Sequence, residues 1–257
     1  MKLIDSHSHL TYEGLSDNLD EILKQCAAVG VSDCITVGTD SDENGKVVEL
    51  VEQYEHLYGA VGIHPHNASK YKPQDIERLK DFAKHKKIVA IGETGLDFYY
   101  NFSQQAEQEQ LFIKSLHAAS DCKLPAIIHS RNAFERTLEI LNDFGSALPK
   151  IVFHCFSGDA KQAEILLEKG FYISFTGVIT FKNAEPLKQA AKIVPLEKML
   201  IETDCPYLSP EPMRKQKINT PALLIYTAKK IAELKNMPLE EFAEKITGTT
   251  KKFFGII

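Results

Sequence analysis

The chain has 257 residues, of which 44% are hydrophobic and 25% are charged, and its formal net charge is −5. This balance is typical of globular proteins and excludes the disordered, collagen-like and disulfide-scaffold classes. The acidic net charge differs from the overall positive charge of most nucleic-acid binders. A nucleic-acid substrate would therefore need positive charge supplied locally, by Lys, Arg or metal ions.

The cysteines and the first residues bear on the cellular location. Five cysteines without C-x-x-C spacing predict free thiols in a reducing compartment. The start at Met1 contains no apolar signal segment, so we expect a cytoplasmic protein. No apolar run approaches the roughly 18 residues of a membrane span, and neither a membrane nor an obligate protein partner is expected.

Eight short apolar runs, typical of strands buried on both faces, follow one another along the chain. They comprise residues 3–4, 34–37, 58–63, 88–91, 126–128, 151–153, 171–175 and 199–201. Helical periodicity between and after them predicts helices over 18–29, 104–122, 160–169 and 239–254. Thr220 and Pro221 are expected to begin the last barrel helix, as N-cap and first helical residue.

Eight strands alternating with helices predict a (β/α)8 TIM barrel, formed as a single domain over residues 1–257. An open, doubly wound sheet is the alternative. It is disfavoured because no glycine-rich phosphate-binding sequence follows the first run.

Metal-ligating and acidic side chains follow most of these runs. They are His7 and His9, His64, Glu93, His129, His154 and Asp204. A barrel gathers the C-terminal ends of its strands around one mouth, so these residues are expected to converge. Any one of them alone is better explained as a structural residue, but the set of imidazoles and carboxylates indicates a divalent metal site.

The spacing and number of these groups predict more than one ion. His7 and His9, two residues apart on a strand, point to the same side and can reach one ion together. Seven candidate groups exceed the four ligands of one tetrahedral ion. Two ions about 3.5–4 Å apart, sharing a bridging carboxylate, would use most of them.

Six ordered blocks of the sequence resemble the TatD-type metal-dependent deoxyribonucleases, a family of amidohydrolase-like barrels. The blocks cover residues 4–10, 62–66, 91–98, 125–131, 154–158 and 202–208. The resemblance implies that His7, His9 and Asp204 hold one divalent ion, that His129 and His154 hold a second, and that Glu93 bridges both. The ions would be Mg, Mn or Zn. Two positions depart from the family pattern: Asn132 stands where Asp is frequent, and Ile218 where Arg is usual.

The predicted function is hydrolysis of a phosphodiester at DNA ends, by an exonuclease-like deoxyribonuclease acting on short single-stranded ends. Asp204 is expected to accept the proton of the attacking water, Glu93 to act with it in catalysis, and His64 and Arg131 to bind the substrate. Arg214, Lys215 and Lys217 are expected to steer the strand, with a solvated turn as the alternative. His66, Asp97, Cys155 and Cys205 receive no active role.

Two other functions remain open. The same metals could hydrolyse an amide, a lactone or an aminoacyl ester, because a fold does not fix the chemistry. A non-enzymatic barrel would be expected to have a broken ligand set, which this sequence does not have. The sequence has no aromatic stripe that indicates a long platform for single strands, so a short substrate end is expected.

Overall fold

The computed structural model describes residues 1–100, 102–147 and 149–256. Eight strands form one sheet in sequence order, and each pairing recorded between neighbours is parallel. The order and the alternation with helices are those of a (β/α)8 barrel, as predicted. The strands are β1 Leu3–Ser8, β2 Val31–Val37, β3 Leu57–Val61, β4 Ile88–Asp97, β5 Ala126–Arg131, β6 Ile151–Phe153, β7 Tyr172–Phe175 and β8 Met199–Ile201.

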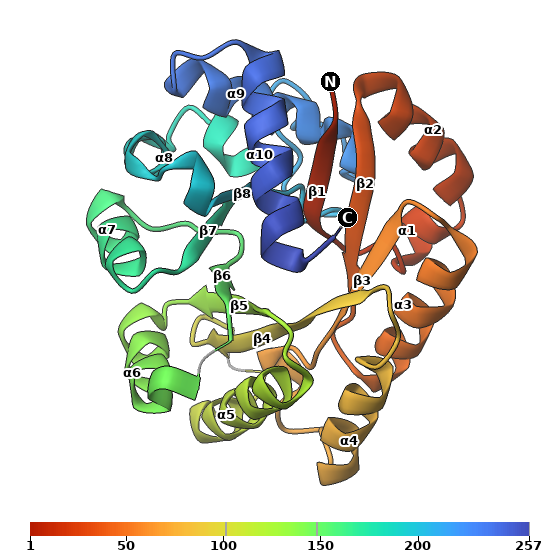
Figure 1. The fold of residues 1–257 in the computed structure, drawn as a ribbon, viewed down its shortest axis with the longest axis vertical. Helices are drawn as coiled ribbons and strands as arrows, with labels where there is room; N and C mark the ends of the chain where they lie inside the picture. Colours follow the sequence, from red (N-terminus) through yellow and green to blue (C-terminus); the bar gives the residue numbers. More distant parts are fainter. Residues whose placement is uncertain (101, 148, 257) are drawn as a thin grey trace. The chain divides into compact units, whose positions relative to one another are not determined.

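Helices separate and follow these strands (Figure 1). They are α1 Glu13–Ser16, α2 Leu19–Val29, α3 Ser41–Gln53, α4 Pro73–Phe82, α5 Gln105–Cys122, α6 Phe134–Phe144, α7 Ala160–Glu168, α8 Glu185–Ile193, α9 Leu224–Leu234 and α10 Leu239–Phe254. The helix predicted over 18–29 ends at Val29, as expected, and the next residue, Gly30, has a φ of 87° in the left-handed region that glycine favours.

The chain divides into two compact units. One consists of Met1–Thr36 with Cys155–Ile257, and the other of Val37–His154. We call them the terminal unit and the central unit. The organisation of the whole chain as a single domain stays a prediction.

Strands β1 and β8 and the segment after β8 lie together in the terminal unit. Ser8 forms a parallel bridge with Cys205, and the backbone N–H of Asp204 donates to the carbonyl oxygen of His7 at 3.0 Å. Helix α10, drawn in blue in Figure 1, packs against both β1 and β8. The end of β1 and the loop after β8 are thereby held side by side.

The central unit contains β3 to β6 with α3 to α6 (Figure 1). Its β4 is ten residues long and buried throughout, so it extends well past the predicted run over 88–91. Gly95 on β4 pairs with His129 on β5 at a φ of 133°, and a Cβ there would collide with the His129 carbonyl oxygen. Only glycine allows these two strands to approach so closely.

The predicted start of the last barrel helix agrees with the structure in position. Thr220 is the N-cap and Pro221 the first residue of a short 3₁₀ turn, Pro221–Leu223, and α9 starts directly after it at Leu224. The Thr220 side chain makes no capping hydrogen bond.

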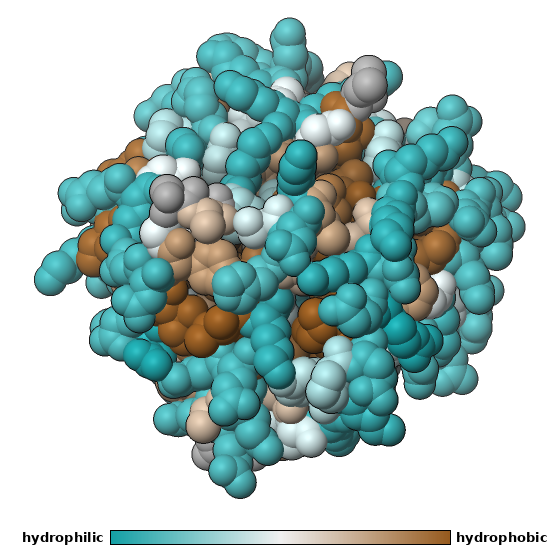
Figure 2. Space-filling model, turned by 60° about the horizontal axis from the view of Figure 1, so that its bottom comes forward, coloured by the Kyte–Doolittle hydropathy of each residue, from teal (hydrophilic) through white to brown (hydrophobic). Residues whose placement is uncertain are grey.

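The surface drawn in Figure 2 is mainly hydrophilic, with hydrophobic residues in separate patches. Among the described residues, no helix has the length and apolar character that crossing a membrane requires.

Candidate metal centre

The first group of metal-ligating side chains lies in the terminal unit. The Nε2 atoms of His7 and His9 are 3.3 Å apart, and Asp204 Oδ1 lies 3.8 Å from the first and 3.4 Å from the second. Consider two ligand atoms that each lie about 2.1 Å from the same ion. They are about 3.0 Å apart when the ligand–ion–ligand angle is a right angle, and about 3.4 Å apart when it is tetrahedral. The three side chains therefore have the spacing of ligands that share an ion.

Backbone contacts fix this group in place. The Asp204 N–H donates to His7, and the His9 N–H donates to the Cys205 carbonyl at 2.8 Å. Asp204 has a φ of 54°, in the left-handed region that residues other than glycine adopt infrequently. Buried Asp5 adds a side-chain contact, since its Oδ1 accepts the Thr203 N–H at 2.9 Å and the His7 N–H at 3.3 Å.

The second group lies in the central unit, around Glu93. The Glu93 side chain is nearly fully buried, and its Oε1 lies 2.7 Å from His129 Nδ1 and 2.6 Å from His154 Nε2. The two imidazole nitrogens are 3.4 Å apart, again the spacing of two ligands on one ion. Burial opposes ionisation of Glu93, but His154 and His64, together with the hydrogen bond from His129, outweigh it and hold the pKa of this carboxyl well below its usual range.

His64 lies beside the second group, and its ring is oriented to donate a hydrogen bond from Nε2. Its Nε2 is 3.5 Å from Glu93 Oε1, while its Nδ1 accepts the backbone N–H of His66 at 3.1 Å. A neutral ring that accepts at Nδ1 carries its proton at Nε2. Burial lowers the pKa of His64 to about 4, so the neutral form is the one present at neutral pH.

Asp97 and His66, which received no role from the sequence, belong to this group. Asp97 is fully buried, and its Oδ2 lies 2.8 Å from His66 Nε2 and 3.2 Å from His129 Nε2. Its carboxylate therefore fixes the His129 ring with Nδ1 directed at Glu93, as carboxylates do for metal-binding histidines. Burial opposes ionisation of Asp97, but the hydrogen bonds from His129, Tyr100 and His66 lower its pKa below the usual range.

The signal for Asp97 is present in the sequence. Glu93 and Asp97 are four residues apart, and residues i, i+2 and i+4 of a strand share a face. The predicted strand ended at Ile91, which left Asp97 in a loop. In the structure β4 runs to Asp97, and both carboxylates contact the ring of His129.

A second buried carboxylate, in the terminal unit, was also missed. Glu202 Oε1 accepts the Cys155 N–H at 2.6 Å, and Glu202 Oε2 accepts the Ser174 hydroxyl at 2.6 Å. These bonds join the chain after β6, the strand β7 and the chain after β8. Cys205 is fully buried.

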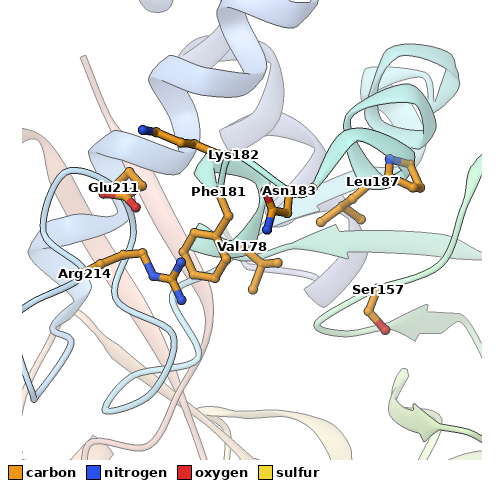
Figure 3. Close-up of a pocket in the computed structure, with 10 residues that line it drawn as sticks. Ser157, Val178, Phe181, Lys182, Asn183, Leu187, Glu211 and Arg214 are labelled. Carbon is orange, nitrogen blue, oxygen red and sulfur yellow. The ribbon is translucent and has the colours of Figure 1, made fainter.

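Of the residues predicted to contact or steer the substrate, Arg131 and Arg214 are exposed, whereas His64 is mostly buried. Arg131 ends β5, and its guanidinium lies over the rings of Tyr99 and Tyr100. Arg214 lies over the ring of Phe181, 3.9 Å from its centroid, and both line a cavity of about 550 Å³ in the terminal unit (Figure 3). In Figure 3 the Lys182 side chain extends away from Arg214.

At the two positions that depart from the family pattern, Asn132 has a φ of 52° and the Ile218 side chain is partly exposed.

Both groups suit divalent ions in their donor chemistry. Each combines neutral imidazole nitrogens with a carboxylate oxygen, a donor set typical of Zn, Mn and Fe sites. The ligand atoms of His7, His9 and Asp204 lie within 4.8 Å of one another. Those of Glu93, His129 and His154 lie within 3.4 Å of one another. Within each unit, the residues present therefore fit an ion.

Comparison with known proteins identifies the family. Residues 4–255 match the model of the TatD related DNases. The chain is 38% identical over 254 residues to the uncharacterized metal-dependent hydrolase YabD of Bacillus subtilis, covering 99% of each chain. It is 33% identical over 258 residues to a protein of Escherichia fergusonii named 3'-5' ssDNA/RNA exonuclease TatD, again covering 99% of each.

A solved structure agrees with these matches. The TatD homologue YJJV of Escherichia coli superposes with a TM-score of 0.93 at 29% identity, over 99% of this chain and 98% of that one. This confirms the predicted barrel. The chain, with its two groups of metal-ligating residues, belongs to the TatD family of metal-dependent hydrolases.

Proposed function

We propose that this protein is an exonuclease that hydrolyses phosphodiester bonds at the ends of single-stranded DNA, in the cytoplasm, with two divalent ions. The observation that carries the proposal is the pair of imidazole–carboxylate groups with metal-ligand spacing. One ion is assigned to His7, His9 and Asp204, and the other to Glu93, His129 and His154. The nuclease names of relatives such as that of Escherichia fergusonii support nucleic acid as the substrate. The role of Glu93 as a ligand shared by both ions stays a prediction.

Divalent ions, when bound, would polarise the phosphodiester and make water a stronger acid near neutral pH. The protein supplies the proton acceptor and a hydrogen-bond donor. Asp204 is partly accessible and offers a carboxylate oxygen to the proton of the attacking water. His64, neutral and protonated at Nε2, donates to a phosphate oxygen without adding a positive charge that would compete with the ions.

A labelled-oligonucleotide assay tests the reaction. Single strands labelled at the 3' or the 5' end are incubated with the protein and Mg²⁺, Mn²⁺ or Zn²⁺, with a chelator as control. Shortening from one end by single nucleotides is expected, and chelator should abolish it. An aminoacyl ester and a lactone are assayed in parallel. Rapid hydrolysis of either, with the oligonucleotides left intact, would reject the nuclease in favour of the alternative hydrolase.

Metal analysis tests the two ligand sets separately. His129→Ala removes a ligand of the second ion, so elemental analysis should find one ion per chain where the wild type has two. His9→Ala should leave the other ion. Two ions retained in either variant would contradict the assignment.

The basic residues after β8 are proposed to recruit the strand. For an enzyme that contacts two or three phosphates at a strand end, the logarithm of the association constant falls with the logarithm of the salt concentration. The expected slope is shallow, about −1 to −3. Neutralising Arg214, Lys215 and Lys217 together should lower kcat/KM at low salt and leave the metal content unchanged. Wild-type activity in this triple variant would show that the cluster is only a solvated turn.

A further inference from the structure

Three large aromatic side chains are exposed together just after β4. Tyr99, Tyr100 and Phe102 keep 55%, 41% and 65% of their accessible surface. The rings of Tyr100 and Phe102 are stacked at a centroid distance of 5.5 Å and an interplanar angle of 9°, and Tyr99 meets Tyr100 edge-on at 4.8 Å. We call these three residues the aromatic cluster. The sequence predicts no aromatic stripe, because these residues follow no strand or helix periodicity.

An arginine completes the surface of the cluster. The guanidinium carbon of Arg131 lies 4.2 Å from the ring centroid of Tyr99 and 4.6 Å from that of Tyr100. A guanidinium that stacks on a ring keeps its in-plane N–H groups directed outward, where they suit a phosphate. Aromatic rings beside a stacked arginine are the surface on which single-stranded nucleic acids place their bases.

The aromatic cluster is joined to the second metal-ligating group by short contacts within the central unit. Asp97 Oδ1 accepts the N–H of Tyr99 at 3.0 Å and that of Tyr100 at 2.9 Å. The other oxygen of the same carboxylate contacts His129. The ring of His66 meets Phe102 edge-on at 4.8 Å and Tyr100 at 5.6 Å. One buried carboxylate therefore positions both a proposed metal ligand and the backbone of the aromatic cluster.

We propose that the aromatic cluster is the stacking site for a nucleobase at the end of the single strand, with Arg131 on the adjoining phosphate. This inference rests on the proposed function and names the part of the substrate that the site binds. Three rings offer room for one or two bases, which matches an enzyme acting on a short end. Every base has an aromatic face, so the site would accept any sequence.

The proposal is tested by combining removal of the aromatic rings in the protein with removal of the terminal base in the bound strand. The protein variants are Tyr100→Ala, Phe102→Ala and the double variant. The ligands are a fluorescein-labelled single strand and the same strand with an abasic residue at its end. Equilibrium binding is followed by fluorescence anisotropy. Ring-preserving Tyr100→Phe and Phe102→Tyr are the matched controls, and Ile113→Ala on α5 is a control for loss of exposed apolar surface.

The wild type should bind the abasic strand more weakly than the intact strand, by about tenfold or more. The double variant should lose a similar factor on the intact strand and bind the two strands equally. The ring-preserving variants should behave as the wild type, and metal content should be unchanged throughout. Equal losses on both strands, or no loss, would overturn the stacking site and would leave a protein-docking surface as the explanation of the cluster.

The binding measurement separates this proposal from the proposed function. Base-dependent binding without cleavage would support the stacking site and reject the nuclease. Cleavage by the wild type with no base dependence would support the nuclease and reject the stacking site.

Discussion

Replacing Asp97 by Asn tests whether this carboxylate controls the metal-binding form of His129. The Asn side chain has nearly the same shape, and its amide oxygen can still accept the N–H groups of Tyr99 and Tyr100. Its amide nitrogen, however, would face His129 Nε2 with a donor in place of an acceptor. His129 would then carry its proton at Nδ1, the atom that lies 2.7 Å from Glu93 and is needed for the ion.

The size of the effect follows from this contact. Removing a carboxylate that orients a metal-binding histidine lowers metal affinity by about 10- to 100-fold, which is about 1.4–2.8 kcal/mol. The substitution removes the acceptor for both His129 and His66, and the loss of a hydrogen bond to a charged group costs about 1.5–3 kcal/mol, which is the same magnitude. The folded structure should persist, since the backbone contacts of Asp97 are preserved.

The measurement is a titration of the metal-free protein with Mn²⁺ by calorimetry, with nuclease activity followed in parallel. The Mn²⁺ affinity of the site assigned to Glu93, His129 and His154 should fall by about 10- to 100-fold. The Mn²⁺ affinity of the site assigned to His7, His9 and Asp204 should not change. Asp121→Asn, on α5 in the same unit and exposed, is the matched control for the change of charge. If Asp97→Asn bound two ions with wild-type affinity, Asp97 would not orient a ligand, and this reasoning would be refuted.

Three further variants test the centre and its scaffold. Glu93→Ala should reduce hydrolysis below about a tenth of the wild-type rate, with the circular dichroism spectrum preserved, because the ion loses its only anionic ligand in this group; a higher rate would contradict ligation. Gly95→Ala should lower the thermal midpoint and the metal content together, because its methyl group would collide with the His129 carbonyl; a variant with wild-type values of both would disprove the close approach. Arg136→Met should slightly lower the thermal midpoint at pH 7 but not at pH 3, since Arg136 binds both oxygens of Glu109 and lowers its pKa. A carboxyl with a lowered folded pKa stabilises the protein above its unfolded pKa, and this contribution is lost as the pH falls.

Strand positions were predictable because a buried parallel strand needs a continuous apolar run. The runs at 151–153 and 199–201 coincide with β6 and β8. The run at 88–91 underestimates β4, because its second half contains Glu93, Thr94 and Asp97, polar residues that are buried by contacts with other elements. Hydropathy along the chain contains no information about such contacts.

For the candidate site, the sequence predicted the types of the residues but not their orientations or protonation states. The histidines and carboxylates that follow the apolar runs of the sequence predicted both groups of metal-ligating residues. The tautomer of His64 depends on a backbone N–H two residues later, and the orientation of His129 depends on a carboxylate on the neighbouring strand. The residues of the aromatic cluster lie outside the helices and strands, where side-chain direction follows no regular period. These features depend on tertiary geometry.

The two groups of metal-ligating residues differ in how much of the chain each one spans, and this affects the unfolded state. Asp204 lies about 195 residues after His9, whereas His154 lies about 61 residues after Glu93. An ion bound to the first group therefore acts as a long cross-link, and one bound to the second as a shorter one. Loop-closure entropy increases with the logarithm of length, so the first cross-link restricts the unfolded chain by about 1 kcal/mol more. An ion bound by His7, His9 and Asp204 would therefore contribute more to keeping the chain folded, in addition to any part in the chemistry.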